Sequence, residues 1–171
     1  MKVEVKISNI VKQDDIEAVV NSANANLRLG SGVAGAIHGA AGIELEKYCE
    51  QFAPLSFGKA IITPAFNLPN AWVIHTRAAN YLLDDNPELV LENCLNAVFA
   101  VANEQKVSSI ALPAIGTGVF KFPIELCASI TAKVIKANAG RCVQLVRVCV
   151  TDEATQAVFM GAVKAEGILQ V

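Results

Sequence analysis

Short apolar runs alternate with amphipathic helical patterns along most of this chain, and this alternation constrains the fold more than any other feature. Strand-like runs cover residues 16–23, 59–66, 71–79, 108–116 and 142–151. Helical patterns cover residues 33–52, 87–105, 123–137 and 153–166. Helices therefore separate the strands except at one strand–strand step. This order predicts an α/β fold whose largely parallel or mixed sheet carries helices on both faces.

A further strand is predicted at the N-terminus, where Val3, Val5 and Ile7 alternate with polar residues. A period of two is typical of a half-exposed edge strand. The chain has 171 residues, of which 53% are hydrophobic and 18% are charged, and this composition suits one domain with a sizeable core. We recognise no internal repeat or linker, and we predict a single domain over residues 1–171.

Charge and cysteine content narrow the classes of function. The net charge is −2, which disfavours binding of extended nucleic acid but is compatible with one phosphate-bearing ligand held by backbone N–H groups. The five cysteines are widely spaced and form no CxxC pair, so we expect no metal site. The apolar runs are too short to cross a bilayer and no signal peptide is recognisable, so we expect a cytoplasmic protein without a membrane partner.

A glycine-rich loop stands directly before a helical pattern in the stretch "LRLGSGVAGAIHGAAG" (27–42). Unpaired N–H groups at a helix N-terminus favour an anion, and glycines let the backbone approach it closely. The stretch "GSGVAG" matches the bare G-x-G-x-x-G pattern, but an asparagine-rich segment separates it from the preceding strand, so we do not interpret it as a dinucleotide site. No GKT or GKS follows, so it is not a P-loop.

Polar or glycine-rich segments follow three of the predicted strands, at residues 21–24, 116–118 and 151–152. In open α/β sheets, ligands bind beyond the carboxyl ends of the strands. If these strands run parallel, the three segments share one edge of the sheet. Two glycine loops at that edge can hold a diphosphate without any lysine or arginine.

The histidines are better explained as structural residues than as catalytic ones. His38 is predicted to be a hydrogen-bonded residue inside a helix, and His75 to be packed or hydrogen-bonded in the core, because no Ser or Cys nucleophile with a paired acid is evident. Asn21 and Asn24 are either turn-forming residues or polar groups whose buried amides need partners.

Two stretches resemble the signature motifs of the macrodomain family. The stretch "AVVNSANANLRLGSGVAGAIHGAAG" (18–42) is similar to the family's V-N-A-A-N motif, short spacer, glycine run and V-(D/A)-x-A-I ending. The stretch "IALPAIGTGVFKFP" (110–123) resembles its second ligand loop, and "ITPAFNL" and "VIHTRAA" look like its middle strands. The resemblance implies a three-layer α/β/α sandwich around a mixed, largely parallel sheet of about six strands, with the whole chain forming one macrodomain.

The same resemblance implies a cleft that binds ADP-ribose, free or attached to protein, at the carboxyl edge of the strands. Backbone N–H groups of two glycine-rich loops would hold the diphosphate, Asn24 would bind the distal ribose hydroxyls, and Phe120 would pack against that ribose. The implied ligand-binding residues are Asn9, Ile10, Ala23, Asn24, Gly30, Ser31, Gly32, Val33, Ala34, Gly116, Thr117, Gly118, Val119, Phe120 and Thr151. No cofactor is expected.

Four positions depart from the family pattern. Asn9 stands where an aspartate usually recognises the adenine amino group, so a charge-assisted hydrogen bond is lost, although the amide oxygen of Asn9 can still accept. Thr151 stands where many members stack an aromatic side chain on adenine. Ala34 stands where strongly hydrolytic members often carry aspartate, and Lys121 replaces a common glycine and is expected to point into solvent.

Three functions remain open on this basis. The first is a binding module for ADP-ribose or ADP-ribosylated protein. The second is hydrolysis, either as a mono-ADP-ribosyl-protein hydrolase or as an O-acetyl-ADP-ribose deacetylase, with Asn24 as the candidate catalytic residue that orients the ribose and with a water held by the ligand's own phosphate. The third, motivated by Asn9 and Thr151, is binding of another nucleotide or of RNA ends.

Overall fold

The computed structural model describes residues 1–168. Its strands are β1 (Lys2–Ile7), β2 (Ala18–Ser22), β3 (Ala60–Pro64), β4 (Trp72–Thr76), β5 (Ser109–Pro113) and β6 (Leu145–Val150). Its helices are α1 (Gly32–Ala41), α2 (Ile43–Cys49), η1 (Glu50–Phe52), α3 (Pro87–Glu104), α4 (Ile124–Ala137) and α5 (Glu153–Ala165). Within these residues, no helix is long and apolar enough to span a membrane.

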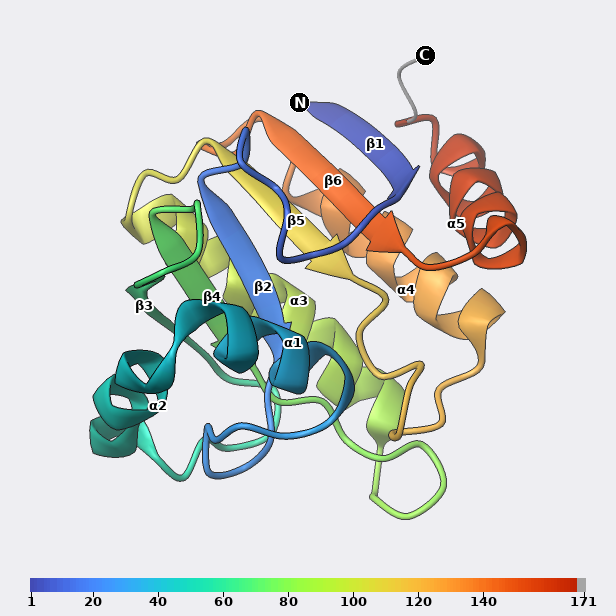
Figure 1. Cartoon of the computed structure of the whole chain (residues 1–171). Helices are drawn as coiled ribbons and strands as arrows, with labels where there is room; N and C mark the ends of the chain where they lie inside the picture. The colour runs from blue at the N-terminus through green and yellow to red at the C-terminus, as the bar shows by residue number, and fades with distance from the viewer. Residues whose placement is uncertain (169–171) are drawn as a thin grey trace.

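The six strands form one mixed sheet in the order β1-β6-β5-β2-β4-β3 (Figure 1). β3 pairs antiparallel with β4, and the other neighbours pair in parallel. β1 lies at one edge, as its alternating pattern predicts. The turn "NLPN" lies between β3 and β4, as predicted, and residues 8–17 between β1 and β2 form no helix either. The predicted α/β class and strand number are confirmed.

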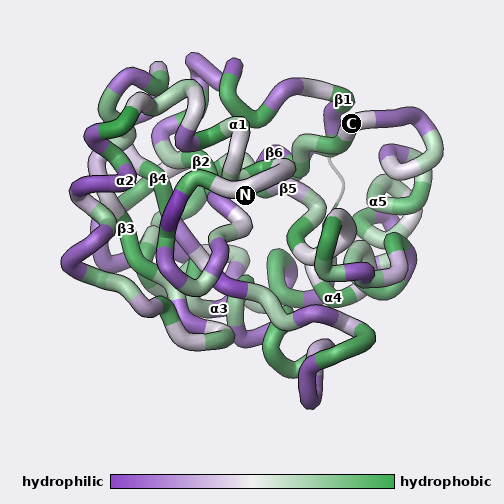
Figure 2. The backbone as a smooth tube through the Cα atoms, turned by 60° about the horizontal axis from the view of Figure 1, so that its bottom comes forward, coloured by the Kyte–Doolittle hydropathy of each residue, from purple (hydrophilic) through white to green (hydrophobic). Residues whose placement is uncertain are grey.

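Each face of the sheet is covered by its own helices. Along β2, the side chains of Ala18 and Val20 join one apolar cluster and that of Val19 joins the other, as alternation along a strand requires. The first cluster packs the sheet against α3, α4 and α5, and the second packs it against α1, α2 and the segment between β1 and β2. The structure is therefore a three-layer α/β/α sandwich. In Figure 2 hydrophobic stretches follow the strands, whereas many hydrophilic stretches lie at the periphery.

The prediction of one continuous helix over residues 33–52 is wrong. Gly42 interrupts it with a φ of +90°, a conformation that L side chains rarely adopt, and the chain continues as α2 and η1 in a new direction. A Cβ on Gly42 would also lie only 2.9 Å from Nδ2 of Asn67, because the turn between β3 and β4 packs against this break. The helical periodicity of residues 33–52 does not reveal this break.

Candidate functional site

The carboxyl ends of the five parallel strands, β1, β6, β5, β2 and β4, form one edge of the sheet, called here the ligand rim. Four of the segments that leave this rim are, in sheet order, residues 8–17 after β1, 151–152 after β6, 114–123 after β5 and 23–31 after β2. Because neighbouring strands are parallel, all four segments lie along the same edge (Figure 1). The three segments that the sequence predicts to be neighbours are therefore brought to one rim.

The segment between β2 and α1, called loop 1 (residues 23–31), is organised by Asn24. The side-chain Oδ1 of Asn24 accepts a hydrogen bond from the backbone N–H of Arg28 at 3.0 Å, and its Nδ2 donates to the Arg28 carbonyl at 2.7 Å. A Cβ on Gly30 would lie 3.1 Å from the same Nδ2. The amide of Asn24 therefore lies directly beside the glycine backbone and forms a turn with Arg28, as the first alternative predicts; Asn24 is only half-buried, so it is not a buried amide.

Loop 1 leads into a helix N-terminus with free backbone donors. Ser31 is the N-cap of α1, but its side chain makes no capping hydrogen bond, and the first turn holds no acidic residue. Within the described residues, the N–H groups of residues 30–34 donate no hydrogen bond to the protein. Such donors, together with the helix dipole, favour a negatively charged group.

Gly35, inside the first turn of α1, keeps loop 1 close to the helix. A Cβ at this position would overlap the backbone carbonyl oxygen of Gly30. A Cβ on Gly39, in the same helix, would meet no other atom within 4 Å. The sequence pattern drew attention to Gly30 and Gly32, whereas only the packing of the loop on the helix reveals why residue 35 is glycine.

The segment between β5 and α4, called loop 2 (residues 114–123), has the second set of free donors. Gly116 has a φ of +87°, and a Cβ there would lie 2.7 Å from the ring of Phe122. The N–H groups of residues 118–120 donate no hydrogen bond within the part of the chain that the structure describes. Thr117 differs, because its N–H and its hydroxyl both donate to the Ala114 carbonyl, at 3.2 and 2.8 Å. A contribution of Thr117 to ligand binding therefore stays a prediction.

The apolar residues of the predicted site divide between the two cores. Ile10 and Ala23 are buried and Val33 is half-buried, and all three belong to the cluster under α1 and α2. Phe120 is half-buried against the cluster on the other face, and its carbonyl accepts the N–H of Tyr81 at 2.7 Å. Val119 is 61% exposed, and Ala34 is buried beneath the start of α1.

Asn9 and Thr151 lie together at the β1–β6 end of the rim. Both are exposed. The Oδ1 of Asn9 accepts the N–H of Val11 at 3.1 Å, so the oxygen expected to face adenine already serves a local turn. The Thr151 hydroxyl donates only a long hydrogen bond, 3.4 Å, to Asp152, whose carboxylate caps α5 by accepting the N–H of Thr155 at 2.7 Å.

The two histidines behave differently from one another. His75 is fully buried, and its ring nitrogens lie 3.0 Å from Nδ2 of Asn21 and 3.0 Å from Oγ1 of Thr63, as expected of a hydrogen-bonded core residue. Burial lowers the pKa of His75 to about 3, so the ring is neutral at neutral pH. His38 is also buried, but neither of its ring nitrogens has a protein partner within the described residues, so the expected hydrogen bond is not formed.

Two of the buried thiols, those of Cys49 and Cys127, are protonated, and the described residues form no cluster of possible metal ligands. Burial raises the pKa of Cys49 to about 11 and that of Cys127 to about 12, which keeps both thiols protonated. Residues 1–168 contain no group of three or more His, Cys, Asp or Glu side chains close enough to hold a metal ion. The predicted site residues offer backbone N–H groups and neutral side chains.

A family model for the Macro domain matches residues 20–131, which is more than half of the chain and includes both glycine-rich loops. The chain belongs to the macrodomain family. A macro domain-containing protein of Lactiplantibacillus plantarum is 37% identical to it over 169 residues, covering 95% of this chain and 98% of that protein. An ADP-ribose glycohydrolase, MACROD2 of Xenopus laevis, is 34% identical over 128 residues, covering 74% of this chain and 31% of that protein.

Solved structures agree with this assignment. The Oceanobacillus iheyensis macrodomain with ADP superposes with a TM-score of 0.89 at 34% identity, covering 95% of this chain and 90% of that chain. A mutant of the same macrodomain, solved with ADPR, superposes with a TM-score of 0.90 at 33% identity, covering 95% of this chain and 92% of that chain. The fold predicted from the resemblance is thereby confirmed for this macrodomain.

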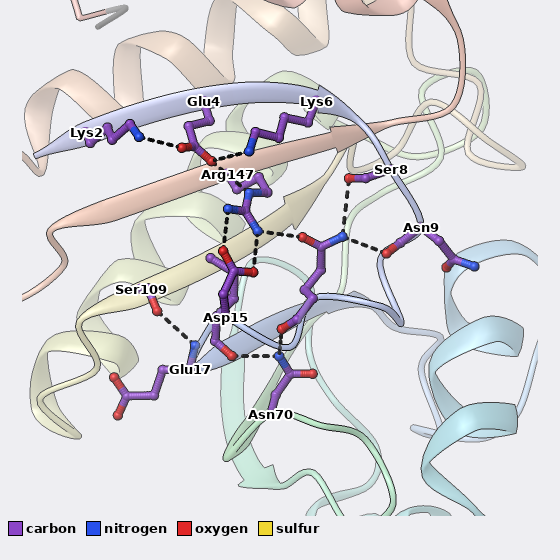
Figure 3. Close-up of polar contacts among 12 residues, drawn as sticks. Lys2, Glu4, Lys6, Ser8, Asn9, Asp15, Glu17, Asn70, Ser109 and Arg147 are labelled. Carbon is purple, nitrogen blue, oxygen red and sulfur yellow. Dashed lines mark hydrogen bonds and ion pairs between the residues drawn. The ribbon is translucent and has the colours of Figure 1, made fainter.

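The sequence patterns do not predict one group of polar residues in this macrodomain, which surrounds the buried side chain of Arg147. Arg147 lies in β6 among apolar neighbours and forms a network with Glu4, Gln13 and Asp15 beneath the β1–β6 end of the rim (Figure 3). The available signal was a single arginine inside the otherwise apolar run "LVRVCV". Its partners lie more than 130 positions away in the sequence, so spacing alone did not connect them.

Proposed function

We propose that this macrodomain binds ADP-ribose, free or attached to protein, along the ligand rim. The diphosphate lies between the free N–H groups of residues 30–34 and those of residues 118–120, and the distal ribose lies against Asn24 and Phe120. The adenine lies at the β1–β6 end, near Asn9, Ile10 and Thr151. The observation that carries this proposal is the position of two sets of backbone donors, unpaired within the described residues, after the carboxyl ends of the neighbouring parallel strands β2 and β5.

The charge of the protein agrees with this mode of binding. The chain has a net charge of −2, so attraction by the whole protein does not bring a doubly charged diphosphate to the rim. Backbone donors at a helix N-terminus bind phosphate without a cationic side chain. The relatives solved with ADP and with ADPR, at more than 30% identity, support the same ligand class for this chain.

Calorimetry with ADP-ribose, ADP and AMP tests the proposal. We expect the affinity to fall by about tenfold when the distal ribose is removed and further when the β-phosphate is removed, because each step deletes several hydrogen bonds. Equal affinities for the three ligands would show that neither the distal ribose nor the diphosphate is recognised, and the proposal would be wrong.

We propose hydrolysis of ADP-ribosyl esters, including O-acetyl-ADP-ribose, as the alternative main role. The similarity to a protein named ADP-ribose glycohydrolase favours it. The predicted site residues include no carboxylate, thiol or histidine, so catalysis rests on orientation of the ribose by Asn24 and on fixation of the phosphate by loop 2. A defined ADP-ribosylated protein, incubated with the wild type and with Asn24→Ala, tests this role. We expect the wild type to release ADP-ribose, and Asn24→Ala to release it at least about tenfold more slowly. Equal rates would remove Asn24 from the mechanism.

A further inference from the structure

Arg147 is a buried cation with partners for its guanidinium on three sides (Figure 3). Its side chain is 8% exposed. The guanidinium forms a two-point contact with Asp15, with both N–O distances at 2.7 Å, and its Nε donates to Glu4 at 2.8 Å. The strand neighbours Val146 and Val148 pack on the opposite face of the sheet, so Arg147 points toward the segment between β1 and β2.

Gln13 connects this cation to the ligand rim. It is only 3% exposed, and its Oε1 accepts from Nη1 of Arg147 at 2.9 Å. Its Nε2 donates to the backbone carbonyl of Asn9 at 2.7 Å and to the Ser8 hydroxyl at 3.2 Å. The backbone carbonyl of Gln13 also accepts from Asn70 at 2.7 Å, so main chain and side chain are both held.

The segment that Gln13 holds has no regular secondary structure of its own. β1 ends at Ile7 and β2 begins at Ala18, and residues 8–17 between them form neither helix nor strand. Asn9 and Ile10, the rim residues of this segment, are therefore positioned by turn hydrogen bonds, by the packing of Ile10 and by side-chain hydrogen bonds rather than by a helix or strand. A buried arginine with several charge-assisted bonds is costly to desolvate, so its main effect is to select one conformation of the segment that it contacts.

We propose that Gln13, held by Arg147, is a positioning residue that sets the adenine end of the ligand rim through the carbonyl of Asn9. The inference rests on the proposed binding of ADP-ribose. It predicts that Gln13 affects recognition of the adenosine half of the ligand and not of the distal ribose phosphate, which contacts loops on β2 and β5. The hydrogen bonds from Arg147 lower the pKa of Asp15 to about 2, so the ion pair that supports Gln13 is charged at neutral pH.

The experiment compares the two halves of the ligand on matched variants. AMP represents the adenosine half and ribose 5-phosphate the distal half, and both are titrated by NMR into the wild type and into Gln13→Ala. We expect about threefold to tenfold weaker binding of AMP, the effect of losing a positioning hydrogen bond, and an unchanged affinity for ribose 5-phosphate. Equal weakening of both ligands, or no weakening of AMP, would overturn the inference.

Two further variants keep the result interpretable. Gln144→Ala also removes a glutamine whose Nε2 donates to a backbone carbonyl, that of Arg141 at 2.8 Å, but it lies before β6 at the opposite edge of the sheet, and we expect it to bind AMP as the wild type does. Gln13→Glu retains an oxygen that accepts from Arg147 but removes the donor to Asn9. Its affinity for AMP should therefore fall as much as that of Gln13→Ala. Wild-type binding of AMP by Gln13→Glu would contradict the role assigned to this donor.

A ligand-free measurement separates this inference from the proposed function. The N–H of Lys12 donates to the same Asn9 carbonyl at 3.0 Å, and its hydrogen exchange reports the order of the segment. We expect faster exchange of this amide in Gln13→Ala and unchanged exchange in the strands. If the wild type binds neither ADP-ribose nor AMP, the proposed function fails, but faster exchange still supports the positioning role. Unchanged exchange in the variant would contradict that role.

Discussion

The two ends of the ligand rim present different chemical groups, namely backbone N–H groups at one end and side chains at the other. At the β2–β5 end, loops 1 and 2 present backbone N–H groups that have no protein partner within the described residues, and glycines allow the chain to expose them. At the β1–β6 end, the rim carries the exposed side chains of Asn9 and Thr151, and the carbonyl of Asn9 is linked through Gln13 to the buried Arg147. Main-chain donors depend on the conformation of the loop, whereas side-chain recognition depends on residues that are scattered along the sequence.

This difference explains which family features the chain keeps and which it lacks. The glycine loops match the family motifs, and in this chain a side chain at Gly116 or Gly35 would crowd neighbouring atoms. The adenine end departs from the family pattern at Asn9 and Thr151, which are both exposed and free of tight packing. We therefore expect variants at the two ends to differ in the size and in the kind of their effects.

The largest effect is expected from Gly118→Glu at the β2–β5 end. The φ of Gly118 is not positive, and a Cβ at this position would meet no atom within 4 Å, so glutamate fits without distorting loop 2. Its carboxylate then lies beside the diphosphate. Charge repulsion and steric bulk should together lower the affinity for ADP-ribose, measured by calorimetry, by at least about 100-fold. Gly161→Glu, at an equally open glycine in α5, is the matched control and should bind normally. Normal binding by a folded Gly118→Glu would show that loop 2 does not hold the diphosphate.

The next effect is expected from Gly35→Ala, which is compared with Gly39→Ala in the same helix. Both changes improve helix propensity by roughly 1 kcal/mol, but only the first places a Cβ against the Gly30 carbonyl. Displacement of loop 1 in Gly35→Ala should lower the affinity for ADP-ribose by about tenfold, because the backbone N–H donors no longer align with the diphosphate. Calorimetry on both variants, with melting temperatures as a check on folding, measures this. If Gly39→Ala loses as much affinity, contact with loop 1 is not the cause.

At the other end, Thr151→Tyr should strengthen binding. An exposed aromatic side chain at this position can stack on adenine, and base–aromatic stacking is worth about 1 kcal/mol or more. We expect about fivefold tighter binding of AMP and of ADP-ribose, and no change for ribose 5-phosphate. An equal gain for ribose 5-phosphate would place Thr151 near the distal ribose instead and would reverse the order of the ligand along the rim.

The smallest effect concerns the stability of the β1–β6 end in acid. The pKa of Asp15 is lowered from 3.8 to about 2, chiefly by its hydrogen bonds with Arg147, so the stabilisation is present above pH 3.8 and is lost as the pH falls toward 2. Because Asp15 is largely exposed, we expect only about 0.5 kcal/mol. In Arg147→Met the free energy of unfolding should fall less between about pH 5 and about pH 2.5, measured by urea denaturation. Arg141→Met, which changes an exposed arginine, should keep the wild-type slope; an equal change in both variants would contradict the assignment.

The sequence was sufficient for the layers of the fold and for the location of the loops. Alternation of apolar runs with helical patterns predicts the sheet, and glycines after strand ends predict loops 1 and 2, because both signals are local. The break at Gly42 is not predicted, because the helical periodicity continues through it and the Asn67 side chain that packs beside it comes from a turn 25 positions away. The network of Gln13 and Arg147 was not predicted either, because its partners come together only after the sheet has formed.

Backbone NMR gives the most direct test of the central claim, which is that unpaired amides from loops 1 and 2 hold a diphosphate. ADP-ribose is titrated into ¹⁵N-labelled protein, and the shifts of all assigned amides are followed. The account predicts that the largest changes occur at residues 30–34 and 118–120, with smaller changes at Asn9, Ile10 and Thr151. Saturable binding that leaves the amides of both loops unmoved would contradict it.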